Sequence, residues 1–299
     1  MAIVPATSYG LAVAARNVEA RPGDRVVLVA GDFRSTVHTW ATWAERGGAG
    51  LHTVERNAVL DAIDERVRVV SVPSVHWVDG AVLDLERIAA RAREAGALLV
   101  VDATQSLGAM PLDLAAMRPD YLVAAGYKWL LGPLGVSYLY VAEAHREGLP
   151  LEENWANRAG AEDFEDPTAG GGYRPGSRRF DVGQRSNFVL IPMALAALGQ
   201  LLDWGVERVA AGLEPITGRI EVETRARGLE ALPARRRGSH MLGVTLPAEA
   251  ASAIREELRA ANVFVELIGS VMRVSPHVHA VDADVDRLLA ALDRALAAR

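Results

Sequence analysis

A lysine and an aspartate follow two neighbouring apolar runs of the sequence. Asp102 closes the run Leu-Leu-Val-Val at 98–101, and Lys128 comes shortly after a second run at 121–125. An unpaired carboxylate at the end of a buried strand is costly, so Asp102 needs a cationic partner. Side chains at the carboxyl ends of strands in an open α/β sheet line one crevice, so we expect the two groups to face each other there. Lys128 is the only lysine among 32 lysines and arginines.

A hydroxyl pair near the start of the chain adds a third chemical group. Thr7 and Ser8 precede a helical run at 9–17, and the free N–H groups and hydroxyls of a helix N-terminus bind phosphate well. An amine, a carboxylate and a phosphate seat are what pyridoxal phosphate requires: a lysine for the Schiff base, an acid that keeps the pyridine nitrogen protonated, and a clamp for the phosphate. The sequence therefore predicts this cofactor.

Each of these residues also has a purely structural interpretation. A buried ion pair would explain Lys128, and helix capping would explain Asp102, Thr7 and Ser8. These alternatives stay open at the level of single residues.

The pattern up to about residue 145 predicts a mostly parallel sheet covered by helices. Short β-branched runs alternate with amphipathic segments, and the runs are continuously apolar, as in strands buried on both faces. We expect strands at 26–30, 50–54, 67–72, 98–101, 121–125 and 136–141, and helices at 8–17, 36–46, 59–64 and 85–95.

The rest of the chain has a different rhythm. Residues 149–187 are loop-rich, and long helical stretches follow at 188–205 and 206–229, with Pro215 at a start or a kink. The remainder predicts an α+β arrangement, with strands at 241–246, 263–267 and 271–274 and helices at 248–261 and 283–297. We therefore expect an α/β fold in two domains: a large domain at 1–187 and a smaller C-terminal α+β domain at 188–299 that includes the connecting helix.

Two motifs carry a resemblance to a known family. Val101-Asp102-Ala103-Thr104-Gln105, followed by the segment AAGYKWLLGP at 124–133, resembles the core of the class V aminotransferase-like enzymes. This group of fold type I includes cysteine desulfurases, kynureninase and isopenicillin N epimerase. The resemblance runs in order from about Ile3 to the C-terminal helix and implies the fold of the PLP-dependent transferases.

The resemblance also implies roles for the cofactor-binding residues. Lys128 would form the Schiff base and then move the proton of the substrate's Cα, and Asp102 would pair with the pyridine nitrogen. The remaining contacts would be a hydrogen bond to the phenolic oxygen, a ring stacked on the cofactor, and the phosphate site, supplied respectively by Gln105, by Phe33, and by Thr7, Ser8 and Tyr127. For Phe33, ordinary core packing remains the alternative.

The substrate residues implied by the resemblance lie elsewhere. Arg273, in Met-Arg-Val-Ser-Pro-His at 272–277, would grip the substrate carboxylate, because a guanidinium suits a carboxylate bidentately. His76, next to Trp77, would border the substrate, although a packed pair explains both equally well. His277 and His279 are a weak metal pair without a third ligand, so we predict no metal site.

The predicted function is that of a PLP-dependent enzyme acting on an amino acid by transaminase or lyase chemistry. The chain contains no cysteine, and on that ground we exclude thiol-dependent cysteine desulfuration. The alternative is a catalytically impaired, PLP-binding homologue that acts as a non-enzymatic partner, because the chain starts almost on the phosphate segment, without the family's N-terminal arm. A nucleotide-dependent enzyme is disfavoured by the absence of a Walker-type loop.

Composition narrows the partners and the compartment. A net charge of −6 and no basic run beyond 235–237 argue against a nucleic-acid binder, and no apolar stretch is long enough to span a membrane. We therefore expect a cytoplasmic protein with a small amino-acid substrate. The family resemblance implies a homodimer.

Overall fold

The computed structural model describes residues 1–166 and 171–297. The chain forms two compact units: the first contains Met1–Ser74, Leu83–Leu107 and Leu112–Leu201, and the second contains Val75–Val82, Gly108–Pro111 and Leu202–Arg299. The sequence placed the division at 187/188 and gave all earlier residues to the large domain. In the structure, two short segments from the first half belong to the second unit. That the boundary at 187/188 separates two independently folding domains stays a prediction.

The first unit is built on a seven-stranded sheet in the order β1-β7-β6-β5-β4-β2-β3. Neighbouring strands from β6 to β3 pair in parallel, and β7 pairs antiparallel with both β6 and β1. The valine-rich strands are buried, as the continuous apolar runs predicted. The bounds are β1 Ala2–Val4, β2 Arg25–Val29, β3 Gly50–Val54, β4 Val67–Pro73, β5 Leu98–Asp102, β6 Tyr121–Ala125 and β7 Ser137–Val141.

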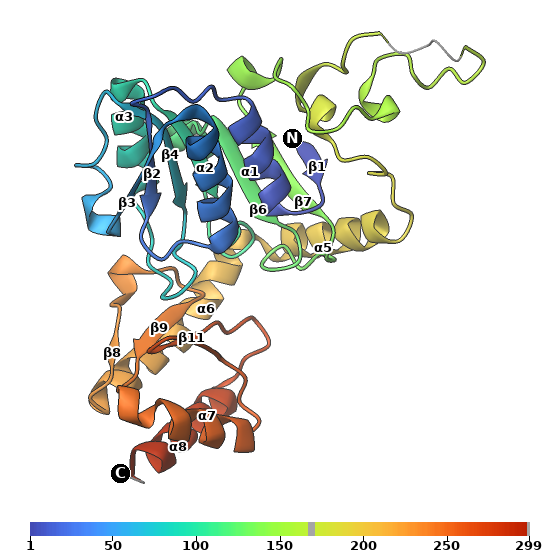
Figure 1. The fold of residues 1–299 in the computed structure, drawn as a ribbon. Coiled ribbons are helices and arrows are strands. Elements are labelled where there is room, and N and C mark those ends of the chain that lie inside the picture. The colour runs from blue at the N-terminus through green and yellow to red at the C-terminus, as the bar shows by residue number, and fades with distance from the viewer. Residues whose placement is uncertain (167–170, 298–299) are drawn as a thin grey trace. The chain divides into compact units, whose positions relative to one another are not determined.

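Helices cover both faces of this sheet. The crossover from β2 to β3 runs in the opposite direction along the sheet from the crossover between β4 and β5, and right-handed crossovers therefore put their helices on opposite faces. Helices α1 (Thr7–Arg16) and α2 (Arg34–Gly47) pack side by side (Figure 1), and α3 (Leu85–Ala95) serves the second crossover. Left-handed glycines follow α2 and α3, as helix C-termini favour.

Two local predictions for the first unit were wrong. The strand β1 was not predicted, because three residues are too short a pattern. The helix predicted at 59–64 is replaced by a 3₁₀ turn, Arg56–Ala58, and further turns. A helix of six residues is marginal on its own, and here Val59 and Ile63 are buried by tertiary packing without it.

Short elements fill the segments between these strands and helices. Helix α4 (Leu114–Met117) begins at Asp113, whose Oδ1 accepts hydrogen bonds from the amides of Ala115 and Ala116. The predicted loop-rich stretch is irregular apart from 3₁₀ turns at Trp155–Asn157 and Gly176–Phe180, and its residues 167–170 lie outside the described part of the chain. Helix α5 (Leu190–Trp204) follows.

The second unit is an α+β arrangement, as predicted. Its antiparallel sheet has the order β10-β11-β9-β8, and one apolar cluster joins that sheet to its helices. Pro215 lies inside α6. The bounds are α6 Val206–Ala226, β8 Glu230–Ala231, β9 Leu242–Thr245, α7 Ala251–Ala260, β10 Glu266–Ile268, β11 Val271–Val274 and α8 Asp282–Ala297. Within the described ranges, every helix is too short or too polar to cross a lipid bilayer.

Candidate functional site

Strand register brings several predicted residues to one edge of the large sheet. Val4 at the end of β1 and Ala125 at the end of β6 both pair with Ser137 of β7. Because β7 runs antiparallel to both, β1 and β6 run parallel and end at the same level. On β5, Asp102 pairs with Val123 of β6, close to this level. The segments after β1, β2, β5 and β6 therefore leave the sheet at its carboxyl edge, where α/β proteins bind ligands.

Asp102 is held by the loop that follows its own strand. Its Oδ1 accepts a hydrogen bond from the amide of Thr104 at 2.9 Å, and the Thr104 hydroxyl accepts one from the amide of Ala125 at 3.1 Å. Burial raises the pKa of Asp102, while the hydrogen bonds from Thr104 and the positive charge of Lys128 lower it. The carboxyl therefore binds a proton more tightly than an exposed aspartate and lies within electrostatic reach of Lys128.

Lys128 lies in a tight turn after β6. The amide of Gly132 donates to the carbonyl of Gly126 at 2.7 Å and the amide of Leu131 donates to that of Lys128 at 3.0 Å. A side chain at Gly126 would place its Cβ 2.4 Å from the carbonyl oxygen of Val136, so only glycine fits there. Leu131 has a φ of 56°, an uncommon conformation for a residue with a side chain and one often found near functional sites.

Phe33 lies over the lysine amine. It precedes α2 in an extended conformation, and 38% of its surface is exposed. The Lys128 Nζ is 5.7 Å from the centroid of the Phe33 ring, within cation–π range. An exposed ring beside the amine is the arrangement expected of a stacking partner and not of a core residue.

Gln105 is the last residue of the segment Asp102-Ala103-Thr104-Gln105 at this edge. Its Oε1 accepts a hydrogen bond from the indole of Trp129 at 3.2 Å, which links the loop after β5 to the turn that carries Lys128. Behind it, the hydroxyls of Ser74 and Ser106 lie 2.5 Å apart. Sequence reasoning missed Thr104 and Trp129 as positioning residues, although both belong to the quoted motifs.

The predicted phosphate residues lie at the same edge. Thr7 and Ser8 form the first turn of α1, and Ala6 before them offers no capping side chain. The amides of Tyr9 and Gly10 donate to the Ala6 carbonyl. The amides of Thr7 and Ser8, which come before them, have no acceptor within the helix and face the space at its N-terminus. Such an end attracts anions. Tyr127 is 46% exposed.

The second unit carries the predicted substrate residues. Its segment Val75–Val82 is a small hairpin in which His76 and Gly80 are joined by the bond from the Gly80 amide to the His76 carbonyl, 2.9 Å long. The His76 Nδ1 lies 2.8 Å from Asp79 Oδ1. His76 is 7% exposed, and its buried Nε2 has no hydrogen-bond partner within the described ranges. An orphaned buried nitrogen of this kind indicates an absent partner.

Arg273 lies beside this hairpin. Its Nη1 donates to the carbonyl of Trp77 at 2.8 Å, and its guanidinium carbon is 6.0 Å from the centroid of the Trp77 ring. Gly243, its register partner on β9, donates its amide to the Asp79 carbonyl at 3.0 Å. Burial lowers the pKa of Arg273, and Glu266 opposes that shift. The predicted residues thus form two groups, one in each unit.

The histidine pair belongs to the second unit. The rings of His277 and His279 are stacked with centroids 6.3 Å apart. Among residues 1–166 and 171–297, no group of three or more histidine, cysteine or acidic side chains is placed to hold a metal ion.

Comparison with known proteins gives consistent matches. The sequence pattern of the family Aminotransferase class-V matches residues 4–211. The chain is 30% identical over 284 residues to the uncharacterized aminotransferase YcbU of Bacillus subtilis (strain 168), which covers 93% of this chain and 74% of YcbU. It is 27% identical over 221 residues to a cysteine desulfurase of Enterobacter sp. (strain 638), which covers 70% of this chain and 53% of the desulfurase.

Solved structures show the same fold. The apo cysteine desulfurase from Thermococcus onnurineus NA1 matches with a TM-score of 0.86 and 19% identity, over 99% of this chain and 79% of the desulfurase. A complex of the cystine C–S lyase C-DES with its product cysteine persulfide matches with a TM-score of 0.83 and 20% identity, over 99% of this chain and 81% of the lyase. The predicted fold type I is confirmed.

One functional expectation is overturned by these matches. The sequence analysis excluded thiol-dependent cysteine desulfuration because the chain has no cysteine, yet several matching relatives and structures are cysteine desulfurases or probable ones. The exclusion was wrong. A carbon–sulfur bond at the β-carbon of an amino acid can also break by elimination, with the sulfur leaving as a thiolate, and this route requires no protein thiol. The missing cysteine therefore does not exclude cleavage of that bond.

Proposed function

The chain belongs to the aminotransferase class-V family, and we propose that it uses Lys128 and Asp102 to transform an amino acid with pyridoxal phosphate. Membership of this family confirms the predicted resemblance, the enzyme class and the cofactor. The assignments of individual residues, the substrate and the assembly are proposals.

The observation that carries the proposal is the pairing of the only lysine with a half-buried acid. The charge of Lys128 acts on Asp102, and both follow strands that end at one edge of the sheet. A structural ion pair would not require an exposed aromatic ring over the amine, as Phe33 provides. Nor would it require a strained turn at Leu131.

The residues at this edge fit the cofactor group by group. Lys128 would hold its aldehyde covalently, Asp102 its ring nitrogen, and Gln105 its phenolic oxygen. The raised pKa of Asp102 suits a carboxyl that shares a proton with a ring nitrogen. The uncapped start of α1, with Thr7 and Ser8, and the exposed Tyr127 would hold the phosphate.

The chemistry of the bound group is that of an electron sink for charge that develops on the substrate's α-carbon. Lys128, once its amine is free and neutral, would accept and return the proton at that carbon. Asp102 would keep the ring nitrogen positively charged. Phe33 would hold the ring plane and exclude water from one side of it.

Substrate recognition would belong to the second group of residues. We propose that Arg273 binds the amino acid's carboxylate through its guanidinium. Its Nη1 bond to the Trp77 carbonyl fixes the side chain in place. His76, with Nδ1 held by Asp79, would turn its orphaned Nε2 toward the substrate.

Cleavage of a carbon–sulfur bond is the candidate reaction that the relatives favour. Six of the matching relatives are cysteine desulfurases or probable ones, and C-DES is a cystine C–S lyase. With no thiol in this sequence, the sulfur would be released as sulfide or within a persulfide product, or it would be transferred to an added thiol. We further propose a homodimer in the cytoplasm, which the family resemblance and the composition support.

The test traps the covalent bond directly. Purified protein is mixed with pyridoxal phosphate, reduced with borohydride and digested, and mass spectrometry locates the added pyridoxyl group. We expect it on Lys128 and nowhere else. Assays with cysteine, cystine and alanine then identify the reaction from released sulfide, persulfide or pyruvate. A trapped cofactor without any response to an amino acid would support the non-enzymatic homologue.

A further inference from the structure

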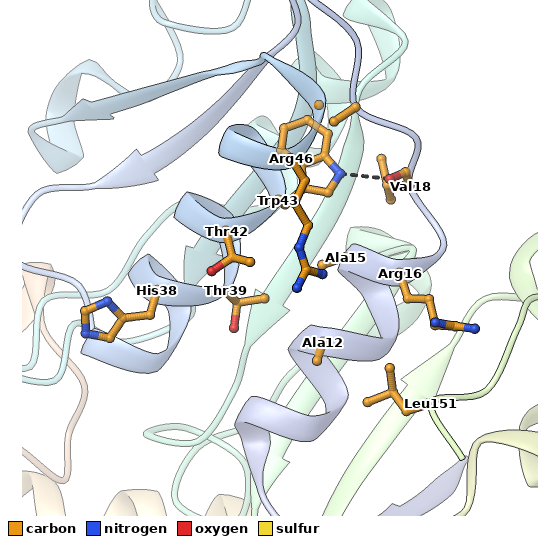
Figure 2. Close-up of a pocket in the computed structure, with 12 residues that line it drawn as sticks. Ala12, Ala15, Arg16, Val18, His38, Thr39, Thr42, Trp43, Arg46 and Leu151 are labelled. Atoms are coloured by element: carbon orange, nitrogen blue, oxygen red, sulfur yellow. Dashed lines mark hydrogen bonds between the residues drawn. The ribbon is translucent and has the colours of Figure 1, made fainter. Parts of the chain in front are cut away.

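A groove lies between α1 and α2 and is lined by residues of these helices and of the segment after α1. It has a volume of about 670 Å³, and Figure 2 shows its lining side chains on these two helices and the segment after α1. Its size falls within the range of ligand-binding pockets. It lies entirely in the first unit and contains none of the residues assigned to the cofactor or the substrate.

The floor of the groove is apolar and rigid. Trp43 is 6% exposed, and its indole donates a 2.8 Å hydrogen bond to the carbonyl of Val18 (Figure 2). Ala12 and Ala15 line the α1 side with only a methyl group each, and Leu151 closes one end. Small side chains on the helix facing a fixed tryptophan leave room for a bulky apolar side chain from another molecule.

Two arginines give the lining of the groove a positive charge. Arg16 and Arg46 line it beside the imidazole of His38, and no aspartate or glutamate belongs to the lining. Within the described part of the chain, neither arginine forms an ion pair within 4.0 Å, although the charge of Arg16 acts on the nearby Glu153. Both arginines lie in the last turn of a helix, where a cation is favoured by the helix dipole. In a chain with 38 acidic residues against 32 basic ones, such a groove is locally distinctive.

The shape of the groove favours a polypeptide helix over a small molecule. It is an open trough between two helices, whereas small-molecule sites enclose most of their ligand. An apolar floor with charges around it matches the apolar face and the flanking carboxylates of an amphipathic helix. Thr39 and Thr42 add hydroxyls along the α2 side.

We propose that the α1–α2 groove binds an acidic amphipathic helix of a second polypeptide. The apolar face of that helix rests on Trp43, Ala12 and Ala15, and its carboxylates pair with Arg16 and Arg46.

The test uses a synthetic helical peptide of about five turns, with leucine and alanine on one face and glutamate on the other. Its fluorescein-labelled form is titrated with the cofactor-loaded protein, and binding is followed by fluorescence anisotropy. We expect saturable binding that weakens about tenfold in Arg16→Gln/Arg46→Gln, since two charge-assisted contacts are lost. The same peptide with lysine in place of glutamate should not bind.

Three further variants locate the binding. Arg255→Gln/Arg259→Gln removes the same charge from exposed positions on α7 and should leave the affinity unchanged. Ala15→Trp fills the trough without changing charge and should also abolish binding, so a folding defect of the arginine variant would not remove the test. Thr42→Cys introduces the only thiol of the chain, and bound peptide should protect it from a maleimide.

The outcomes that overturn the proposal are distinct. They are absence of saturable binding to the wild-type protein, equal affinity for Arg16→Gln/Arg46→Gln, or a thiol at position 42 that stays reactive when the peptide is bound. If inorganic phosphate protects this thiol from the maleimide while the acidic peptide does not, the occupant of the groove is a small anion. The proposal of a polypeptide partner would then be wrong. None of these outcomes bears on Lys128.

Discussion

The two groups of candidate residues are positioned by different means. At the edge of the large sheet, Asp102 and Lys128 are placed by strand register. Residues next to them in the sequence hold them by hydrogen bonds, as the Thr104 amide does for Asp102. In the second unit, His76 and Arg273 are placed by a hairpin that docks on an antiparallel sheet through backbone contacts at Gly243 and Gly80. The comparison teaches that the first group depends on contacts between neighbouring strands and tight turns, whereas the second depends on close approach between distant parts of the chain.

The largest effect is expected from removing the amine at the sheet edge. Lys128→Ala should lose the covalent cofactor and lower the turnover of the responding amino acid by at least about 10³-fold, because both the covalent anchor and the proton carrier are gone. Absorbance of the bound cofactor and turnover measure the two losses. Arg273→Ala, by contrast, should keep the cofactor. If Lys128→Ala still yields a borohydride-trapped adduct, the sheet edge is not the cofactor site.

Asp102→Asn should separate activity from stability at the same edge. We expect turnover to fall about 10²–10³-fold, since an amide cannot hold the positive ring nitrogen. The raised pKa of Asp102 means that the folded state binds its proton more tightly than the unfolded state. The contribution of this proton to stability is present below the ordinary pKa of 3.8 and is lost as pH rises through the folded value.

The apo form of Asp102→Asn should therefore melt at a higher temperature than wild type at neutral pH. The difference should vanish in acid, where both side chains are neutral. Calorimetry of the apo proteins across pH measures this. A variant less stable than wild type at neutral pH would mean that the carboxylate is satisfied without the cofactor.

In the second group, the arginine should act on substrate affinity. Arg273→Lys should raise KM about 10–100-fold with little change in kcat, because a point charge replaces a bidentate fork. Cofactor absorbance should not change. Steady-state kinetics of Arg273→Lys, with the amino acid found by the product assays, measure the two constants. A loss confined to kcat would show that Arg273 does not bind the carboxylate.

Gly80→Ala tests the docking of the hairpin. Gly80 has a φ of +76°, and an added Cβ would lie 2.5 Å from the carbonyl oxygen of Met241. We expect a stability loss of about 1–3 kcal/mol and a rise in KM, since the Trp77 carbonyl that holds Arg273 would shift. Gly96→Ala, also at positive φ but in open space, is the matched control and should leave KM unchanged.

Phe33→Leu should give the smallest effect. It keeps an apolar side chain near the amine but removes the ring, so we expect a fall in turnover of about tenfold or less. Cofactor affinity, measured by absorbance titration, should weaken by a similar factor. Unchanged affinity would assign Phe33 to packing.

The same contrast explains how far the sequence alone could lead. The strands at 50–54 and 121–125 and the helix at 85–95 were predicted with the bounds that the structure shows, because short runs of strand-favouring residues and a strong amphipathic period are local signals. The Asp-x-x-Gln and Tyr-Lys motifs were also local. The residues at the sheet edge could therefore be named from the sequence, apart from β1, Thr104 and Trp129, and their roles toward the cofactor stay predictions.

The second group could be predicted only in part. Nothing local indicates that 75–82 leaves the first unit, since its docking depends on contacts with Met241 and Gly243, more than 160 positions away in the sequence. Asp79 was missed, although its spacing of three residues from His76 was a usable signal. The helix expected at 59–64 failed for the converse reason, because tertiary packing overrode a weak local period.

The turn that presents Lys128 has a practical consequence. It carries the only side-chain amine of a chain rich in arginine, so a reagent that acylates lysine can modify only this one side chain. A reporter dye or a solid support could be attached there at defined stoichiometry. Conversely, a preparation fully loaded with pyridoxal phosphate should resist such conjugation, which gives a simple assay of occupancy that requires no substrate.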